Sequence, residues 1–97
     1  MKALLSIKPE FAFQIFAGNK KFEYRRKIFK QPVDSIVVYV SSPISMVLGE
    51  FEVDDLLFDN LDELWSKTKG ASGISEEFFY QYFDNKKHGY AIKIGKV

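Results

Sequence analysis

One short segment near the N-terminus concentrates the side chains best suited to chemistry or ligand binding. Residues 18–26 read Gly-Asn-Lys-Lys-Phe-Glu-Tyr-Arg-Arg, which places four cations, one carboxylate and two aromatic rings in nine residues. Arg25 suits a bidentate contact with a phosphate or a carbonyl group, or an ion pair with Glu23. Lys20 could polarise a carbonyl, or act as a base if burial lowered its pKa. The alternative is a solvated strand face from which long basic side chains extend into water.

Several common catalytic and metal sites are excluded by residue type. The chain has no cysteine and one histidine, His88, in a Lys-Lys-His-Gly turn. Two-histidine metal sites, cysteine-ligated zinc and thiolate nucleophiles are therefore absent. The acidic run 54–59 lacks the glycine and the ligand spacing of a calcium loop, so we expect solvated surface or helix-cap charge there. No nucleotide-binding glycine motif occurs, and the sequence predicts neither a metal nor a cofactor.

Charge is distributed unevenly, although the formal net charge is only +1. Six Lys and Arg residues between positions 18 and 30 are opposed by Glu23 alone, whereas residues 50–63 hold seven acidic side chains and no cation. Such asymmetry orients an anionic ligand toward the basic side and repels it from the other. The acidic side could instead meet a basic protein partner.

Hydrophobic periodicity predicts the elements that must position the basic segment. Pro9 suits the first turn of a helix, and Gly18 suits its left-handed end. Alternation from Lys21 onward predicts a strand that sends Glu23 and Arg25 to one face. The other expected elements are strands at 2–7, 36–40, 46–53 and 90–94, and helices capped by Asn60 and Ser75, with Phe78, Phe79, Tyr82 and Phe83 as a buried stripe. The strand at 36–40 is apolar throughout, which indicates a central strand covered on both sides.

The predicted fold is therefore α+β, a compact β-barrel flanked by helices. Strands this short, with a bend at Gly49 and a terminal strand able to pair with the first, favour a closed or nearly closed sheet. The chain of 97 residues reads as one domain. No stretch has the length of a secretory signal or a membrane span, so we expect a soluble cytoplasmic protein.

The ordered motifs resemble those of the ASCH superfamily. Gly18-x-Lys20-x-x-Glu23-x-Arg25 matches its G-x-K-x-x-E-x-R signature, and the likeness extends over the whole chain. The other matching segments are Ser6-Ile7-Lys8-Pro9, Tyr39-x-Ser41-Ser42-Pro43, Gly49-Glu50-Phe51 and Gly89-Tyr90-Ala91-Ile92. The resemblance implies a small PUA-like barrel with a charged cleft beside its helices.

The same resemblance implies a set of ligand-binding residues: Lys8, Lys20, Lys21, Glu23, Arg25, Arg26, Tyr39, Ser41 and Ser42. Ser41 and Ser42 could equally form an ordinary turn at the end of a strand. Tyr24, Phe22 and Tyr39 could belong to the core or stack on a base, and the core is the favoured interpretation.

Three functions fit these features. The first is binding of RNA or a nucleotide-like ligand, in RNA metabolism or in regulation of transcription or translation. The second is a small hydrolase, either a ribonuclease or an amidohydrolase of modified nucleosides, with Lys20 and Glu23 as acid and base. One small subgroup of ASCH-like proteins resembles amidohydrolases and has a threonine nucleophile. The matching position in this chain is Glu23, whose carboxylate cannot replace the threonine hydroxyl. The third is a protein-interaction domain of the coactivator type.

Overall fold

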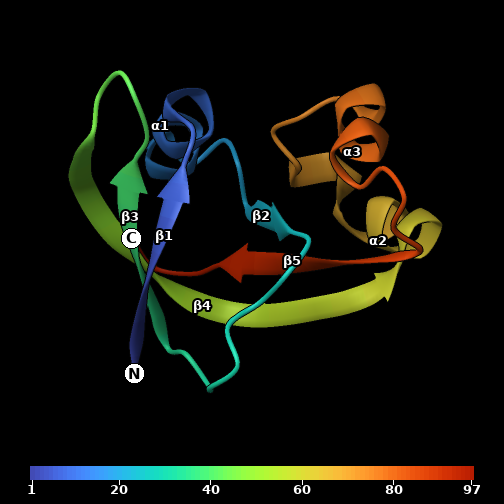
Figure 1. Cartoon of the computed structure of the whole chain (residues 1–97), viewed down its shortest axis with the longest axis horizontal. Coiled ribbons are helices and arrows are strands. Elements are labelled where there is room, and N and C mark those ends of the chain that lie inside the picture. Colours follow the sequence, from blue (N-terminus) through green and yellow to red (C-terminus); the bar gives the residue numbers. More distant parts are fainter.

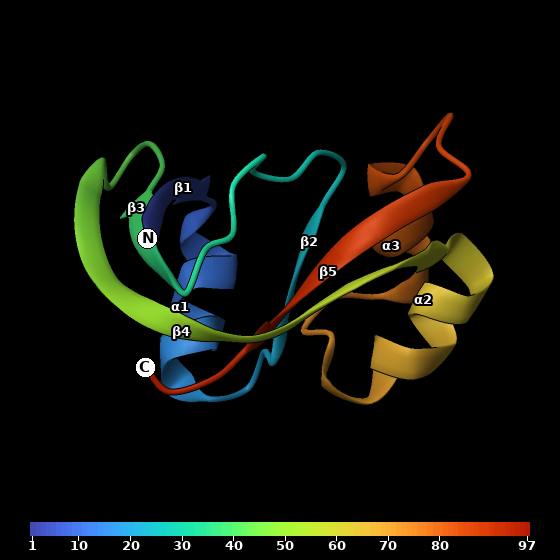
Figure 2. The same cartoon turned by 90° about the horizontal axis from the view of Figure 1, so that it is seen from below.

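Five strands and three α-helices make up the computed structural model, which describes all residues 1–97 (Figure 1). In chain order the elements are β1 (Lys2–Ile7), α1 (Pro9–Ala17), β2 (Phe22–Arg25), β3 (Ser35–Val40), β4 (Met46–Asn60), α2 (Leu61–Thr68), a 3-10 turn at Lys69–Ala71, α3 (Glu76–Tyr82) and β5 (His88–Ile94). Figure 2 shows α1 at one end of the molecule and α2 and α3 at the other, joined by the long strand β4. None of the helices has the length and the apolar run needed to cross a membrane.

The sheet is open, so the expected barrel is not confirmed, although the α+β class is. Its strand order is β1-β3-β4-β5-β2, with β1 and β3 parallel and the other pairs antiparallel. The terminal strand β5 pairs with β4 and β2 instead of closing onto β1. Both edges, β1 and β2, therefore remain free.

Strand β4 runs further than its alternation predicts, through the acidic residues expected to form solvated surface or a cap. Its first part pairs with β3 and its second part with β5. The register shifts opposite Val38 and Tyr39, beside Gly49, and again between Val53 and Asp55. Each shift adds an unpaired residue, which bends a strand and increases its twist. The curvature brings the two free edges of the sheet toward each other.

Helix boundaries follow the capping residues in the sequence. Gly18 ends α1 with a positive φ of 86°, a conformation that glycine adopts without steric cost. Asn60 Oδ1 accepts from the Glu63 backbone N–H at 2.9 Å, and Ser75 Oγ accepts from the Phe78 N–H at 3.0 Å. Both predicted N-caps are therefore confirmed.

Two hydrophobic cores hold the two ends of the molecule. The first core packs α1 against β1, β3, β4 and β5, through Ile7, Ala12, Ile15, Ile36, Val38, Val40, Phe51, Ile92 and Ile94. The second core packs α2 and α3 against β2 and β5, through Tyr24, Leu64, Phe79, Phe83 and Ala91. In β3, Ile36, Val38 and Val40 are buried, while Val37 and Tyr39 on the other face are only half-covered. Strand β3 is thus central but fully covered on one face only.

Candidate functional site

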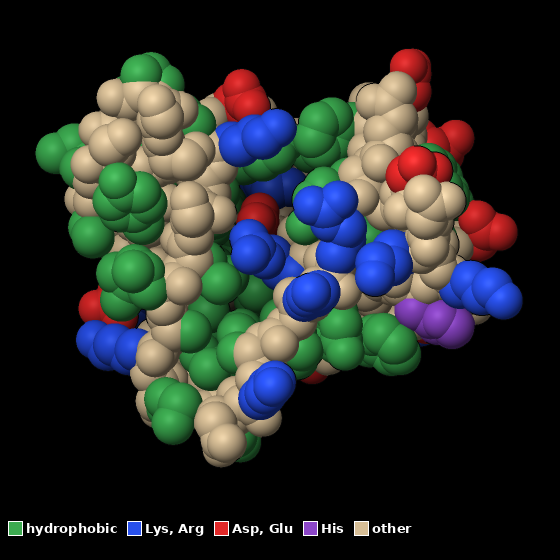
Figure 3. All heavy atoms as spheres, in the orientation of Figure 1, with side chains coloured by type: hydrophobic (Ala, Val, Ile, Leu, Met, Phe, Trp, Pro, Cys, Tyr) green, Lys and Arg blue, Asp and Glu red, His purple; other side chains and the backbone are tan.

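A cavity of about 300 Å³ lies where the free edges of β1 and β2 approach each other. We call it the edge pocket; it is lined by Ser6, Ile7, Lys8, Phe11, Lys20, Glu23, Tyr24, Arg25, Arg26, Ile74, Phe78 and Tyr82. Figure 3 shows basic side chains around a hollow on this face, with a carboxylate visible inside it. The volume is at the lower end of the range for small-molecule sites.

Lys20 lies inside the pocket wall, with 1% of its surface exposed. Its Nζ donates to the Ser72 carbonyl at 2.6 Å and lies 5.1 Å from the Phe11 ring centre and 5.0 Å from that of Tyr24. Burial lowers the Lys20 pKa to about 8, although the nearby Glu23 charge opposes the shift. A lysine with such a pKa can exchange a proton near neutral pH.

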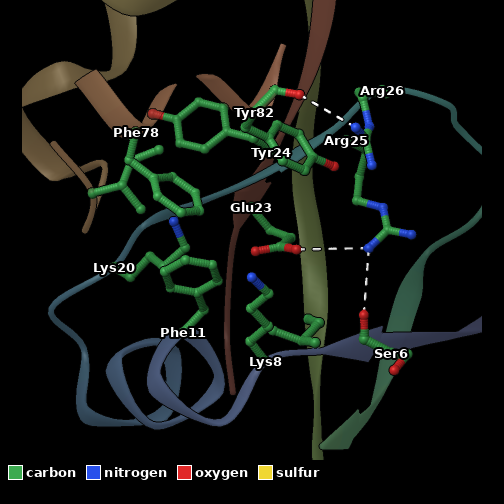
Figure 4. Close-up of a pocket in the computed structure, with 12 residues that line it drawn as sticks. Ser6, Lys8, Phe11, Lys20, Glu23, Tyr24, Arg25, Arg26, Phe78 and Tyr82 are labelled. Carbon is green, nitrogen blue, oxygen red and sulfur yellow. Dashed lines mark hydrogen bonds and ion pairs between the residues drawn. The ribbon is translucent and has the colours of Figure 1, made fainter. Parts of the chain in front are cut away.

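Glu23 lies beside Lys20 and is also buried, with 6% of its surface exposed. Its Oε2 atom lies 3.8 Å from Arg25 Nη1, the same nitrogen that donates to the Ser6 carbonyl at 3.5 Å. Burial raises the Glu23 pKa, while Lys20 and Arg25 oppose the shift. Arg25 therefore spans the gap between β2 and β1, where a closed barrel would have had backbone hydrogen bonds (Figure 4).

Aromatic rings and two further cations complete the wall. The Arg26 guanidinium lies 4.7 Å from the centre of the Tyr82 ring and donates to the Tyr82 carbonyl at 3.5 Å. Lys8 Nζ lies 5.8 Å from the centre of the Phe78 ring. The pocket thus combines flat aromatic surfaces with four cations and one carboxylate.

A second depression continues from the edge pocket and shares Arg25, Arg26 and Tyr82 with it. Its other lining residues are Lys27, Asp84 and Lys86, so it holds four cations against one carboxylate. We call it the basic groove. Its position gives an anionic chain a path away from the pocket.

Five of the residues expected to bind a ligand meet in the edge pocket, namely Lys8, Lys20, Glu23, Arg25 and Arg26. The other four do not line it. Lys21 is exposed just before β2, while Tyr39, Ser41 and Ser42 lie at the end of β3. The Ser41 N–H bonds to the Ile7 carbonyl at 3.0 Å, which keeps this turn next to the end of β1. A binding role for these four residues stays a prediction.

Sequence reasoning missed the apolar half of the pocket. Phe78 and Tyr82 fall in a helical stripe expected to be core, yet they are only half-buried and line the cavity together with Phe11 of α1. Helical spacing shows which face of a helix is covered, but it does not distinguish a packed core from a pocket wall. Their closeness to cations is a property of the tertiary fold.

No group of three or more His, Asp or Glu side chains is arranged to hold a metal ion. The side chains of the edge pocket offer proton exchange at Lys20 and Glu23, charge stabilisation by Arg25, and stacking on the aromatic rings.

Comparison with known proteins gives one family and several relatives. The model of the ASCH domain matches residues 5–97. An ASCH domain-containing ribonuclease from Zymomonas mobilis is 29% identical over 92 residues, covering 94% of this chain and 62% of that protein. The ATP synthase subunit alpha of Ureaplasma parvum is 32% identical over 95 residues, covering 97% of this chain and 12% of that protein. The chain therefore spans less than two thirds of these relatives.

Solved structures agree with the fold. The crystal structure of ASCH from Zymomonas mobilis superposes with a TM-score of 0.91 at 27% identity, covering 98% of this chain and 67% of that one. A second solved structure, that of a hypothetical protein, aligns over the full length of both chains, with a TM-score of 0.69 at 20% identity. The second likeness shows the fold alone.

Proposed function

This chain belongs to the ASCH domain family, and on that basis we propose that its edge pocket binds single-stranded RNA. The proposal rests on one observation: aromatic rings and cationic side chains line the same cavity, and this cavity leads into the basic groove. Bases of single-stranded RNA are unstacked and can lie against aromatic rings, while their phosphates interact with Lys and Arg. The relative named as a ribonuclease supports the same class of ligand.

Arg26 tests this proposal most directly, because it borders both the pocket and the groove. We expect a fluorescently labelled mixed-sequence RNA to bind the protein with an affinity that falls as salt rises. Arg26→Ala should weaken binding about tenfold, because it removes both a phosphate contact and the cation stacked on Tyr82. Fluorescence anisotropy at two salt concentrations measures both effects.

Lys96→Ala is the matched control, since it removes the same charge from a residue that lines neither cavity. It should bind RNA like the wild type. Equal affinities of Arg26→Ala and Lys96→Ala, or no binding by the wild type, would refute the proposal.

RNA cleavage is a second candidate, favoured by the paired pKa shifts of Lys20 and Glu23. In this hypothesis the Glu23 carboxylate accepts the proton of the attacking hydroxyl, and the Lys20 ammonium donates a proton to the departing oxygen. Arg25 stabilises the charge on the phosphate. General acid–base catalysis by one side chain typically raises a reaction rate about 10²–10⁴-fold.

The cleavage hypothesis is tested with labelled RNA resolved on a denaturing gel. The wild type should cut this RNA, and Lys20→Ala should hardly cut it at all. If the RNA stays intact with the wild type, the cleavage hypothesis is wrong and RNA binding remains as the proposed function.

A further inference from the structure

Glu23 has more hydrogen-bonding capacity than the protein uses. Its carboxylate is nearly fully buried, yet the one ion pair that it forms within 4 Å is with Arg25 Nη1, at 3.8 Å. A buried carboxylate is normally stabilised by several close donors. Figure 4 shows that the Glu23 oxygens face the cavity instead of the protein interior. Two adjacent acceptors are therefore presented to whatever enters the pocket.

Donors flank this carboxylate. Figure 4 shows the ammonium groups of Lys8 and Lys20 and the guanidinium of Arg25 arranged around it. Lys20 uses one donor on the Ser72 carbonyl, and an ammonium group has three. Lys8 forms no ion pair or side-chain hydrogen bond, and its ammonium lies over the Phe78 ring. Arg25 lies beside one Glu23 oxygen and the lysines lie on the other side, so from Arg25 toward the lysines the pocket floor presents acceptor, acceptor and donor, between aromatic walls.

One RNA base carries the complement of this pattern on its Watson–Crick edge. Guanine presents two adjacent N–H donors, on N2 and N1, followed by the O6 acceptor. Adenine and cytosine each offer one amino group next to a ring-nitrogen acceptor, which would face a carboxylate oxygen. Uracil has a single N–H between two carbonyl groups. For these three bases at least one Glu23 oxygen would be buried against another acceptor, which is unfavourable.

We infer that the edge pocket selects guanine in single-stranded RNA, with Glu23 as the residue that reads the base. The inference rests on the proposed RNA binding at this pocket. The Glu23 oxygens accept from N1–H and N2–H, a lysine ammonium donates to O6, and the purine ring lies between Phe78, Phe11 and Tyr82. The ribose and its phosphates then face Arg25 and Arg26, at the start of the basic groove.

The test uses short uridine oligonucleotides that carry one variable nucleotide at their centre, so that no guanine tetrads form. The central nucleotide is guanosine, adenosine, cytidine, uridine or inosine, and binding is followed by fluorescence anisotropy. A bidentate base contact discriminates by about ten- to a hundredfold, so guanosine should bind tighter than the other three standard nucleotides by that factor. Inosine keeps N1–H and O6 but lacks the N2 amino group, and it should fall between guanosine and the rest.

Glu23→Gln supplies the matched variant, because an amide of the same shape presents one acceptor and one donor. It should lose the preference for guanosine and favour adenosine and cytidine, whose amino group and ring nitrogen match an acceptor and a donor. Equal binding of the wild type to all five, or a guanosine preference that survives in Glu23→Gln, would overturn guanine selection while leaving RNA binding intact. Absence of binding to any of them would overturn RNA binding itself. The wild-type series decides the question even if Glu23→Gln fails to fold.

Discussion

Lys20 is a charged side chain held where water hardly reaches it. Its stem is covered by the loop at Ser72 and Gly73, and its ammonium lies over two aromatic rings. Moving an ammonium group out of water is costly, and a lysine in this position releases its proton more readily than in the unfolded chain. The protein therefore loses stability by keeping a cation here, which is typical of a residue retained for binding or chemistry.

The lowered Lys20 pKa predicts a particular dependence of stability on pH. The folded protein releases this proton above about pH 8, whereas the unfolded chain keeps it until about 10.5. Between these values the unfolded state binds more protons, so the free energy of unfolding rises with pH. The rise from pH 8 to pH 10 should be about 2 kcal/mol, measured by urea denaturation at several pH values. Above pH 10 the raised pKa of Tyr24, about 12, opposes the trend.

Lys20→Met removes the titrating group while keeping a stem of similar length. Its free energy of unfolding should be nearly constant between pH 8 and pH 10 apart from changes shared with the wild type. Parallel pH profiles for the two proteins would mean that Lys20 does not carry the shifted pKa.

At the scale of elements, the turn between the 3-10 segment and α3 fixes the position of Lys20. Ser72 supplies the carbonyl that Nζ bonds, and Gly73 packs directly on the lysine stem with a positive φ of 69°. A Cβ atom at Gly73 would lie 2.8 Å from Lys20 Cγ and 2.7 Å from Gln14 Oε1. Only glycine satisfies both the backbone conformation and this close approach.

Gly73→Ala should therefore cost about 1–3 kcal/mol of stability and also weaken RNA binding, because Lys20 must move to admit the methyl group. Urea denaturation and anisotropy measure the two effects. Gly70→Ala, in the adjoining 3-10 segment, is the matched control, since a Cβ there meets nothing within 4 Å. It should leave both properties close to those of the wild type. Equal effects of the two substitutions would contradict this role for Gly73.

The elements themselves were largely predictable from local signals. The Gly18 helix end and the Asn60 and Ser75 caps each depend on a few neighbouring residues, and all three are observed. The pairing of β5 with β2 was not predicted, because alternation identifies a strand but not its partner. The acidic run was expected to be solvated surface or a cap. It lies within β4, and a strand can hold these residues because their carboxylates remain in contact with water.

The candidate site divides in the same way. Glu23 and Arg25 could be placed on one strand face from their spacing alone, with Lys20 in the glycine turn before the strand. The aromatic wall includes Phe11 of α1 and Phe78 and Tyr82 of α3, which are far apart in the sequence and meet only in the folded chain. No local pattern carries that information. Tyr39, Ser41 and Ser42 follow from family likeness, and the fold puts them outside the cavity lining.

On the scale of the whole molecule, the failure of the sheet to close creates the site. Strand β4 curves far enough to bring β1 and β2 together, and Arg25 reaches across the gap that remains. The edge pocket occupies this gap and opens into the basic groove, while the acidic residues of β4 lie in the strand that joins the two ends of the molecule. A polyanion is thereby attracted to the side that carries the pocket.

Lys27 and Lys86 predict how far a bound strand extends along this basic side. Both line the groove but not the pocket, so they can meet phosphates flanking the bound base without touching the base itself. Lys27→Ala with Lys86→Ala should weaken RNA binding for every sequence alike and reduce the slope of log affinity against log salt by about 1–2. Anisotropy titrations across a salt series measure the slope. The double variant Lys93→Ala, Lys96→Ala removes the same charge from residues outside both cavities and should leave the slope unchanged. A slope altered equally by the two double variants would indicate that RNA responds to net charge and does not follow the groove.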